Sequence, residues 1–370
     1  MKHSNKIHVK LKRSIDDSYD IVIGASLFPE IAGFLSRQYK GRRFALITDS
    51  NLVKSGQSAK LLRALARRQI GPSLHVFQAG EKSKTLSTCT TLLGQLGAKG
   101  YGRDTVVLAL GGGVVGDMAG LVAALHTRGV PYIQMPTTTV SQADSSIGGK
   151  TGVDTQQGKN LVGIFKQPAR VFIDVEALRT LPNREYISGL AETVKHAVIR
   201  NKAFFAFLEQ NADKIKTRDP KVLQRVAREN CKIKGYVVER DPEEKGMRRI
   251  LNYGHTIGHA LERETNYRLL HGECIAIGMM VAGKIAELKY GFPDLARQKS
   301  LLRQLGLPVR IPAGISNERL LKAAAMDKKA VKNTPRFSLP SQIGTMLSFG
   351  GAYVDVVYKS IILRAIDDTR

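Results

Sequence analysis

The sequence predicts two domains: an α/β domain with a Rossmann-like parallel sheet, followed by an all-α domain. Short β-rich runs alternate with helical patterns in the first half, and long helical stretches replace them after about residue 180. A glycine-rich turn directly follows one of the strands. With 370 residues and 43% hydrophobic content, the chain is large enough for two cores. We place the boundary near Thr180–Pro182, which gives domains 1–180 and 181–370; one continuous α/β domain is the alternative.

Five β-rich runs predict the strands of the parallel sheet. They are RFALITD (Arg43–Asp49), SLHVFQ (Ser73–Gln78), TVVLAL (Thr105–Leu110), YIQMP (Tyr132–Pro136) and RVFIDV (Arg170–Val175). Between them, Val53–Gln69 and Leu86–Leu96 carry apolar residues at three- and four-residue spacing. This spacing predicts helices that cover the sheet.

Long helical stretches after the boundary predict the second domain. They include GLAETVKHAVI, VLQRVARENCKIKGYVVE and CIAIGMMVAGKIAELK. The most membrane-like segment of the chain, Val106–Leu125, contains Asp117 and five glycines. We interpret it as a buried strand, a turn and a helix, and the sequence therefore predicts no membrane partner.

The net charge of +25 raises the possibility of a nucleic-acid partner. The basic residues are spread along the chain, however, there is no Trp, and no nucleic-acid-binding motif occurs, so we expect no specific nucleic-acid partner. Cys89, Cys231 and Cys274 lie far apart and form no C-x-x-C pair, which indicates a reducing compartment. Together with an N-terminus that lacks an apolar signal-peptide core, this predicts a cytoplasmic protein.

The segment DSSIGGKT (Asp144–Thr151) ends like an ATP-binding P-loop. Asp144 occupies the position of the first P-loop glycine, and its carboxylate would repel phosphate groups. We therefore expect no nucleotide hydrolysis here. What remains is a Gly148–Gly149 turn that presents Lys150 and Thr151, which could hold another kind of anion.

The glycine-rich turn GGGVVGD (Gly111–Asp117) lies between a predicted strand and a predicted helix. A helix N-terminus in this position can receive a diphosphate, so the turn is a candidate dinucleotide site. Asp49 ends an earlier strand, where a carboxylate can bond ribose hydroxyls. The spacing differs from the standard G-x-G-x-x-G, and a purely structural turn is the alternative.

The segment LNYGHTIGH places His255 and His259 four residues apart, on one face of a helix. His271 follows twelve residues later, and Glu192 lies upstream. Histidines and a carboxylate held by helices suit Zn²⁺ with an open position for a substrate, whereas buried core histidines are the alternative. From spacing alone, His255 and His259 would both be ligands.

Two further groups of polar residues stand near this cluster. In EEKGMRRILN, Glu244, Arg248 and Asn252 would share one helical face, with a solvated salt bridge as the alternative. In AMDKKAV, Lys328 and Lys329 form a basic pair, for which simple surface exposure is the alternative.

Taken together, the motifs resemble those of the 3-dehydroquinate synthase family, sugar-phosphate cyclases of the shikimate pathway. They occur in order as GEKSK, GGGVVGD, RGV, PTTTVSQADSSIGGKTGVD, GKNLVG, GLAETVKH, NYGHTIGHA, HGE and DKK. The resemblance covers roughly residues 20–350 and is most specific over 136–163. It implies an NAD-binding α/β domain, a helical metal- and substrate-binding domain and an active site between them.

The resemblance also implies a role for each matching residue. Zinc, or cobalt, would be bound by Glu192, His255 and His271, while His259 would contact substrate hydroxyls and relay a proton. NAD would be held by Asp49, Asn51, Glu81, Lys84, Gly112, Gly113, Gly116, Asp117, Thr137, Thr138, Asp144, Lys150, Lys159, Thr180 and Leu181. Substrate would meet Lys150, Asn160, Lys195, Lys234, Glu244, Arg248, Asn252 and a lysine of the DKK pair, Lys328 or Lys329. Arg128 matches an arginine that reaches the neighbouring subunit's site, which implies a homodimer.

The reaction implied is conversion of 3-deoxy-D-arabino-heptulosonate 7-phosphate to 3-dehydroquinate and phosphate, with NAD reduced and reoxidised within one turnover. A polyol dehydrogenase would have little use for Lys150, Lys234 and Arg248 together. A sister cyclase would keep nearly all of these residues, and its discriminator is the carboxylate-binding set Lys234, Arg248 and Asn252. A non-catalytic basic binding protein is the remaining alternative.

Overall fold

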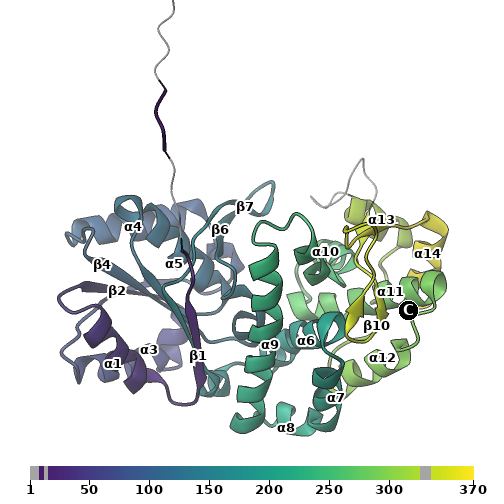
Figure 1. The fold of residues 1–370 in the computed structure, drawn as a ribbon, viewed down its shortest axis with the longest axis horizontal. Coiled ribbons are helices and arrows are strands. Elements are labelled where there is room, and N and C mark those ends of the chain that lie inside the picture. The colour runs from purple at the N-terminus through teal and green to yellow at the C-terminus, as the bar shows by residue number, and fades with distance from the viewer. Residues whose placement is uncertain (1–7, 12–15, 326–334) are drawn as a thin grey trace, which may run out of the picture.

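The computed structural model describes residues 8–11, 16–325 and 335–370. The first half is built on a six-stranded sheet in the order β1-β8-β5-β4-β2-β3, and all of its neighbouring strands are parallel (Figure 1). Its strands are β1 (Asp20–Gly24), β2 (Arg43–Asp49), β3 (Ser73–Phe77), β4 (Thr105–Gly111), β5 (Tyr132–Pro136) and β8 (Arg170–Asp174). The five predicted strands are confirmed to within one residue at each end. The edge strand β1, whose side chains are at most partly buried, was not predicted from the sequence.

Helices cover both faces of this sheet, because successive strand side chains point to opposite sides. Phe44 and Leu46 pack beneath α1 and α3 on one face. Ala45 and Ile47 pack beneath α4 and α5 on the other. The helices of this half are α1 (Phe28–Gln38), α2 (Ser50–Lys54), α3 (Gln57–Ala66), α4 (Leu86–Ala98) and α5 (Gly113–Leu125). The single helix expected over 53–69 is divided in two, because the backbone turns left-handed at Gly56 (φ 74°).

The second half is mostly helical, and in Figure 1 α9 stands between the sheet and the remaining helices. Its helices are α6 (Asn183–Arg200), α7 (Lys202–Gln210), α8 (Ala212–Lys216), α9 (Pro220–Arg240), α10 (His255–Glu264), α11 (His271–Tyr290), α12 (Leu295–Gln304), α13 (Asn317–Ala325) and α14 (Lys359–Asp367). The predicted fold class is confirmed. The structure adds four short strands paired as two antiparallel ribbons, β9 (Arg336–Phe337) with β12 (Asp355–Val356) and β10 (Pro340–Gln342) with β11 (Thr345–Met346).

The segment that follows DSSIGG forms a hairpin of β6 (Lys150–Thr155) and β7 (Gly158–Phe165). Gly148 and Gly149 have φ values of 95° and 66°, so the turn expected there is present. A P-loop would continue into a helix, whereas this turn continues into a strand. The backbone geometry is therefore different from that of an ATP-binding loop.

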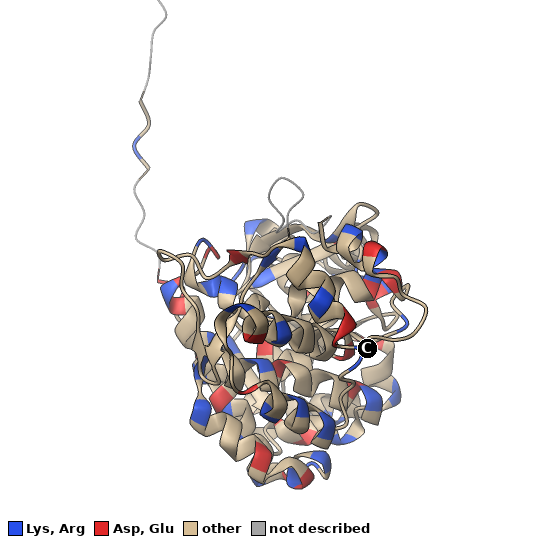
Figure 2. Ribbon diagram, turned by 90° about the vertical axis from the view of Figure 1, so that its right-hand side faces the viewer, with Lys and Arg blue, Asp and Glu red and all other residues tan. Residues whose placement is uncertain are grey.

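The two halves meet where a 3-10 turn, Val175–Thr180, is followed by α6. The division into domains 1–180 and 181–370 stays a prediction. Within the described ranges, no helix combines the length and apolarity needed to cross a bilayer. Lys and Arg residues are distributed over most of the elements seen in Figure 2, with acidic residues between them.

Candidate active site

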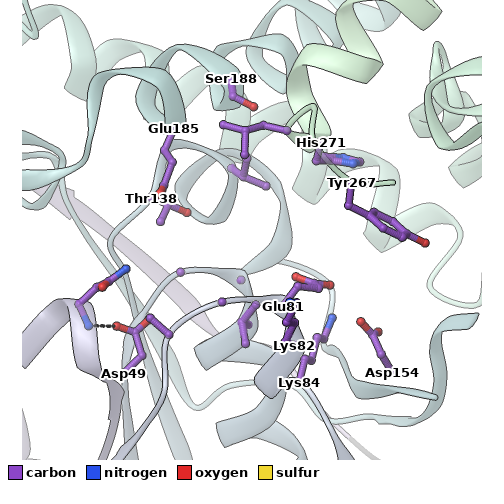
Figure 3. A pocket seen from close by; sticks show the side chains of 18 of the residues that line it. Asp49, Glu81, Lys82, Lys84, Thr138, Asp154, Glu185, Ser188, Tyr267 and His271 are labelled. Atoms are coloured by element: carbon purple, nitrogen blue, oxygen red, sulfur yellow. Dashed lines mark hydrogen bonds between the residues drawn. The ribbon is translucent and has the colours of Figure 1, made fainter. Parts of the chain in front are cut away.

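A cavity of about 1130 Å³ opens at the carboxyl ends of the sheet strands, where the two halves of the chain face each other. Figure 3 shows Glu81, Lys84 and Asp154 on one side of it and Tyr267 and His271 on the other. Most of the residues expected to hold NAD line this cavity, namely Asp49, Asn51, Glu81, Lys84, Gly112, Gly113, Thr137, Thr138, Lys159, Thr180 and Leu181. Parallel sheets commonly bind nucleotides at this edge.

The glycine-rich turn forms one wall of the cavity. Gly112 is the N-cap of α5, so the N–H groups of the first helical turn lie at the wall. A Cβ on Gly112 would lie 2.9 Å from Thr138 Cγ2, which explains why a glycine is needed. Asp49 caps α2, where its Oδ1 accepts from the backbone N–H groups of Asn51 and Leu52. The wall therefore fits a diphosphate, with a fixed carboxylate nearby.

Several of the expected cofactor residues contact one another. Lys84 Nζ lies 2.6 Å from Asp117 Oδ2 and donates to Asn160 Oδ1 at 2.5 Å. Although burial disfavours the charged form of Lys84, Asp117 and Glu81 outweigh it and raise the pKa of the ammonium group. Asn160, expected at the substrate, is therefore held by a lysine expected at the cofactor. Gly116 does not line the cavity; it lies in α5, where a Cβ would come within 2.7 Å of Gln134 Oε1.

Glu192, His255 and His271 offer ligand atoms that all lie within 4.8 Å of one another. His271 Nε2 is 3.2 Å and His255 Nε2 is 3.6 Å from Glu192 Oε1. His255 Nδ1 lies 3.2 Å from the Tyr253 carbonyl oxygen, and an N–H donated there leaves Nε2 as a ligand. These residue types and distances fit a Zn²⁺ or Co²⁺ ion. Burial opposes ionisation of Glu192, yet Lys195 and His271 hold the pKa of its carboxyl well below the ordinary value.

Close helix packing brings the three residues together. His271 is the first residue of α11, and Gly272 follows it against α6; a Cβ on Gly272 would lie 1.7 Å from the Ser188 carbonyl oxygen. A Cβ on Gly278 would lie 2.0 Å from the Gly254 carbonyl oxygen, just before α10. Without side chains at these points, α11 approaches both neighbouring helices, and His271 meets Glu192 and His255.

His259 lies on the same helix as His255, with ring centroids 5.2 Å apart, and 6.2 Å from the His271 ring. Among the described residues, it belongs to neither of the two groups with metal-ligand spacing. The second group consists of Asp144, Glu192 and His196. The pairing of His255 with His259 as two ligands, suggested by spacing alone, is thus less favoured by the geometry than the set with His271.

The expected substrate cations pair with carboxylates beside this cluster. Lys234 Nζ is 2.6 Å from Asp144 Oδ1, and His196 Nε2 approaches the same oxygen at 3.5 Å. Lys195 pairs with Glu192 one helical turn away, and both side chains are almost fully buried. Burial lowers the pKa of Lys234, an effect that Asp144 offsets in part.

Glu244 connects the two halves of the chain, because it pairs with Lys150 of β6 and accepts from Asn252 Nδ2 at 3.0 Å. The expected helical face of Glu244, Arg248 and Asn252 is wrong. Glu244 has a left-handed backbone (φ 62°), and a 3-10 turn spans Met247–Asn252. Asp241 imposes this conformation by accepting from the backbone N–H groups of Lys245, Gly246 and Arg248.

Arg248 is buried, and its guanidinium donates to the Pro242 carbonyl oxygen at 2.6 Å and to that of Gly148 at 3.5 Å. It therefore sits against the turn that presents Lys150. Arg128 lies on the surface away from the pocket lining, in a stretch where Thr127 and Arg128 both have positive φ. Lys328 and Lys329 lie outside the described residues.

Asp241 and Glu262 were not predicted from the sequence. Asp241 gives no motif signal, because its role is to bond backbone groups downstream of it. Glu262 lies 2.5 Å from His271 Nδ1, and its position seven residues after His255, on the same helix face, could have indicated it.

Two solved structures of related enzymes share this fold. One is 2-deoxy-scyllo-inosose synthase complexed with carbaglucose-6-phosphate, NAD⁺ and Co²⁺, at TM-score 0.87 and 29% identity, covering 95% of this chain and 96% of that one. The other is 2-epi-5-epi-valiolone synthase from Streptomyces hygroscopicus with NAD⁺ and Zn²⁺ bound, at TM-score 0.87 and 28% identity, covering 98% and 99%. The fold is thus that of the cyclases related to dehydroquinate synthase.

Sequence comparison identifies the family within this class. Residues 74–188 match the model of the 3-dehydroquinate synthase N-terminal region, and residues 189–330 match that of the C-terminal region. The 3-dehydroquinate synthase of Ruminiclostridium cellulolyticum is 45% identical over 329 residues, which span 88% of this chain and 91% of that protein. The chain belongs to the 3-dehydroquinate synthase family, and the resemblance found in its motifs is confirmed.

Proposed function

We propose that the chain is a carbon–oxygen lyase that converts 3-deoxy-D-arabino-heptulosonate 7-phosphate to 3-dehydroquinate and phosphate, the second step of the shikimate pathway. Membership of the 3-dehydroquinate synthase family supports this reaction. The observation that carries it is the group of cations, Lys150, Lys195, Lys234 and Arg248, beside a cluster with metal-ligand spacing. A substrate with a phosphate and a carboxylate needs such a group.

The cofactors that we propose are NAD, in the cavity of about 1130 Å³, and one divalent metal, zinc in preference to cobalt, on Glu192, His255 and His271. When bound, NAD accepts a hydride and returns it, and the metal polarises the hydroxyl oxygen that is oxidised. Related enzymes carry NAD⁺ with Co²⁺ or Zn²⁺. The free, buried cysteines support a reducing cytoplasm as the site of action.

The side chains of this chain would orient the substrate and move its protons. Lys150 and Asn252, both held by Glu244, would bind the substrate from opposite halves of the chain. Lys195, Lys234 and Arg248 would neutralise its anionic groups in a buried environment, where charge interactions are strong. His259, beside His255, would relay the hydroxyl proton. The substrate phosphate itself would be the base for its elimination.

We propose that Asp144 contacts the nicotinamide. It lies 2.6 Å from Lys234, and burial of its carboxyl is outweighed by Lys234 and Lys195, which hold its pKa well below the ordinary value. An ionised carboxylate would thus stand next to the cations that meet the substrate. A polyol dehydrogenase has no anionic substrate for these cations.

Two events distinguish a synthase from a dehydrogenase: the release of phosphate and the return of the hydride to the substrate. With the heptulosonate phosphate, Zn²⁺ and trace NAD⁺, we expect many equivalents of inorganic phosphate per chain while NADH absorbance stays near its starting level. A colorimetric assay measures the released phosphate, and absorbance at the NADH band measures the NADH. Conversion of the trace NAD⁺ to NADH without catalytic phosphate release would establish a dehydrogenase, and absence of both changes would exclude this substrate.

We also propose a homodimer, supported by an apolar patch on the β6–β7 hairpin. Leu161, Val162, Ile164 and Phe165 of β7 are 40–52% exposed in the single chain. Exposed apolar patches of this kind mark interaction surfaces. Arg128, which is exposed, follows α5, and α5 packs on this hairpin.

A further inference from the structure

Glu262 is a buried carboxylate that connects the metal-ligand cluster to the cofactor side of the cavity. It lies on α10, and only 7% of its side chain is exposed. Oε1 is 2.5 Å from His271 Nδ1, and Oε2 is 3.9 Å from Lys159 Nζ. Both oxygens therefore face groups that carry or can carry a proton.

The contact with Glu262 determines which nitrogen of His271 is available as a ligand. An ionised carboxylate accepts hydrogen bonds, so the shared proton belongs on Nδ1, and Nε2 keeps its lone pair. Nε2 is the atom that faces Glu192, at 3.2 Å. His255 is oriented in the same sense by a backbone carbonyl oxygen. Because a carboxylate makes an imidazole more basic than a carbonyl does, His271 would be the stronger nitrogen ligand.

Glu262 is itself held from the other half of the chain. Lys159, in β7, lies 3.7 Å from Glu81 Oε1 as well as near Glu262, and its ammonium sits over the Tyr267 ring at 4.6 Å. The Tyr267 N–H donates to the Glu262 carbonyl oxygen at 2.8 Å, with a left-handed backbone (φ 57°). The local turn thus returns the chain to the end of α10 and places an aromatic ring beside the lysine.

We propose that Glu262 is a positioning residue of the metal site, which holds His271 in the orientation and protonation that present Nε2 to the ion. This inference rests on the proposed function in one respect, namely that Glu192, His255 and His271 bind a metal. It adds a residue outside the three-ligand set that acts on the metal site through His271.

The test is a metal titration without substrate and without NAD. Apo-protein of the natural sequence, Glu262→Gln and Glu264→Gln is titrated with Zn²⁺ against a competing chelator, and with Co²⁺ by its visible absorption. Glu264 is the matched control, since it lies on the same helix and pairs with Arg319 at 2.6 Å. We expect Glu262→Gln to weaken metal binding about 10–100-fold, and Glu264→Gln to leave it unchanged.

A second variant separates positioning from folding. Glu262→Asp keeps the charge but shortens the reach, so its metal affinity should fall between those of the natural sequence and Glu262→Gln, with unchanged far-ultraviolet circular dichroism. At saturating Zn²⁺, Glu262→Gln should reach most of the kcat of the natural sequence. Metal binding by Glu262→Gln and Glu262→Asp as tight as in the natural sequence would overturn the inference. Failure of the natural sequence to bind one metal per chain would instead overturn the proposed function.

Discussion

At the scale of single residues, the candidate metal site depends on the absence of a side chain at Gly272. The Gly272→Ala change would force a Cβ into a backbone carbonyl oxygen on α6, 1.7 Å away, so α11 would have to move outward. We expect a loss of about 1–3 kcal/mol in unfolding free energy, as for overpacked cores, together with loss of bound metal because His271 moves from Glu192. Thermal melting and metal content per chain would measure both.

Gly235→Ala provides the control for this change. Gly235 lies inside α9, and a Cβ there would meet nothing within 4 Å. Alanine is favoured over glycine in a helix by about 0.5–1 kcal/mol, so this variant should be as stable as the natural sequence or more so. If Gly272→Ala bound metal and melted like Gly235→Ala, the close packing of α11 on α6 would not be what forms the site.

At the scale of the elements, strands and helices with a periodic apolar pattern were predicted correctly from the sequence. Turns shaped by distant or irregular contacts were not. Apolar periodicity predicts the central strands and α4, because their side chains are buried against the faces of the sheet. The turn that holds Glu244 and Arg248 has no periodicity, because it is shaped by three backbone hydrogen bonds to Asp241. The i,i+4 spacing there suggested a helix, although Glu244 has a positive φ that regular helices do not contain.

The candidate site shows the same division. The motifs indicated that Glu192, His255 and His271 belong together, and the structure brings them together through glycine contacts between helices. Local spacing favoured His259 as a ligand instead, because a single helix face carries no information about α6 and α11. Glu262 was missed for the same reason, since its partner is the first residue of the next helix.

The edge strand β3 should respond to acid through His75. This side chain is buried, with Nδ1 2.9 Å from Gln95 Oε1 of α4. Burial lowers the pKa of His75, with Lys99 adding repulsion. A lowered folded pKa gives stability that is present above the unfolded pKa, about 6.5, and is lost as the pH falls through the folded value.

Melting of the natural sequence and of His75→Gln between pH 8 and pH 5 would test this. The melting temperature of the natural sequence should fall more steeply below about pH 6.5 than that of His75→Gln, which has no group to protonate. Parallel curves would show that the charge state of His75 does not matter to the fold.

At the scale of the whole molecule, the hairpin patch should decide the oligomeric state. Leu161→Glu combined with Ile164→Glu places two charges among the exposed apolar side chains of β7, which a second subunit would have to desolvate. We expect sedimentation velocity to show a dimer for the natural sequence and a monomer for the double variant. Leu74→Glu, on the exposed part of β3, is the matched control and should remain dimeric. A natural sequence that sediments as a monomer would contradict the proposal.

The pairing of the site's cations with its own carboxylates has a consequence for turnover. Lys150, Lys195 and Lys234 are matched by Glu244, Glu192 and Asp144. In the proposed reaction, an incoming phosphate or carboxylate would therefore compete with these carboxylates for the lysines, and its net gain would be the difference between two ion pairs. After phosphate departed, the carboxylates would pair with the lysines again. The site would thus work like an ion-exchange resin, with no bare charge left at either stage.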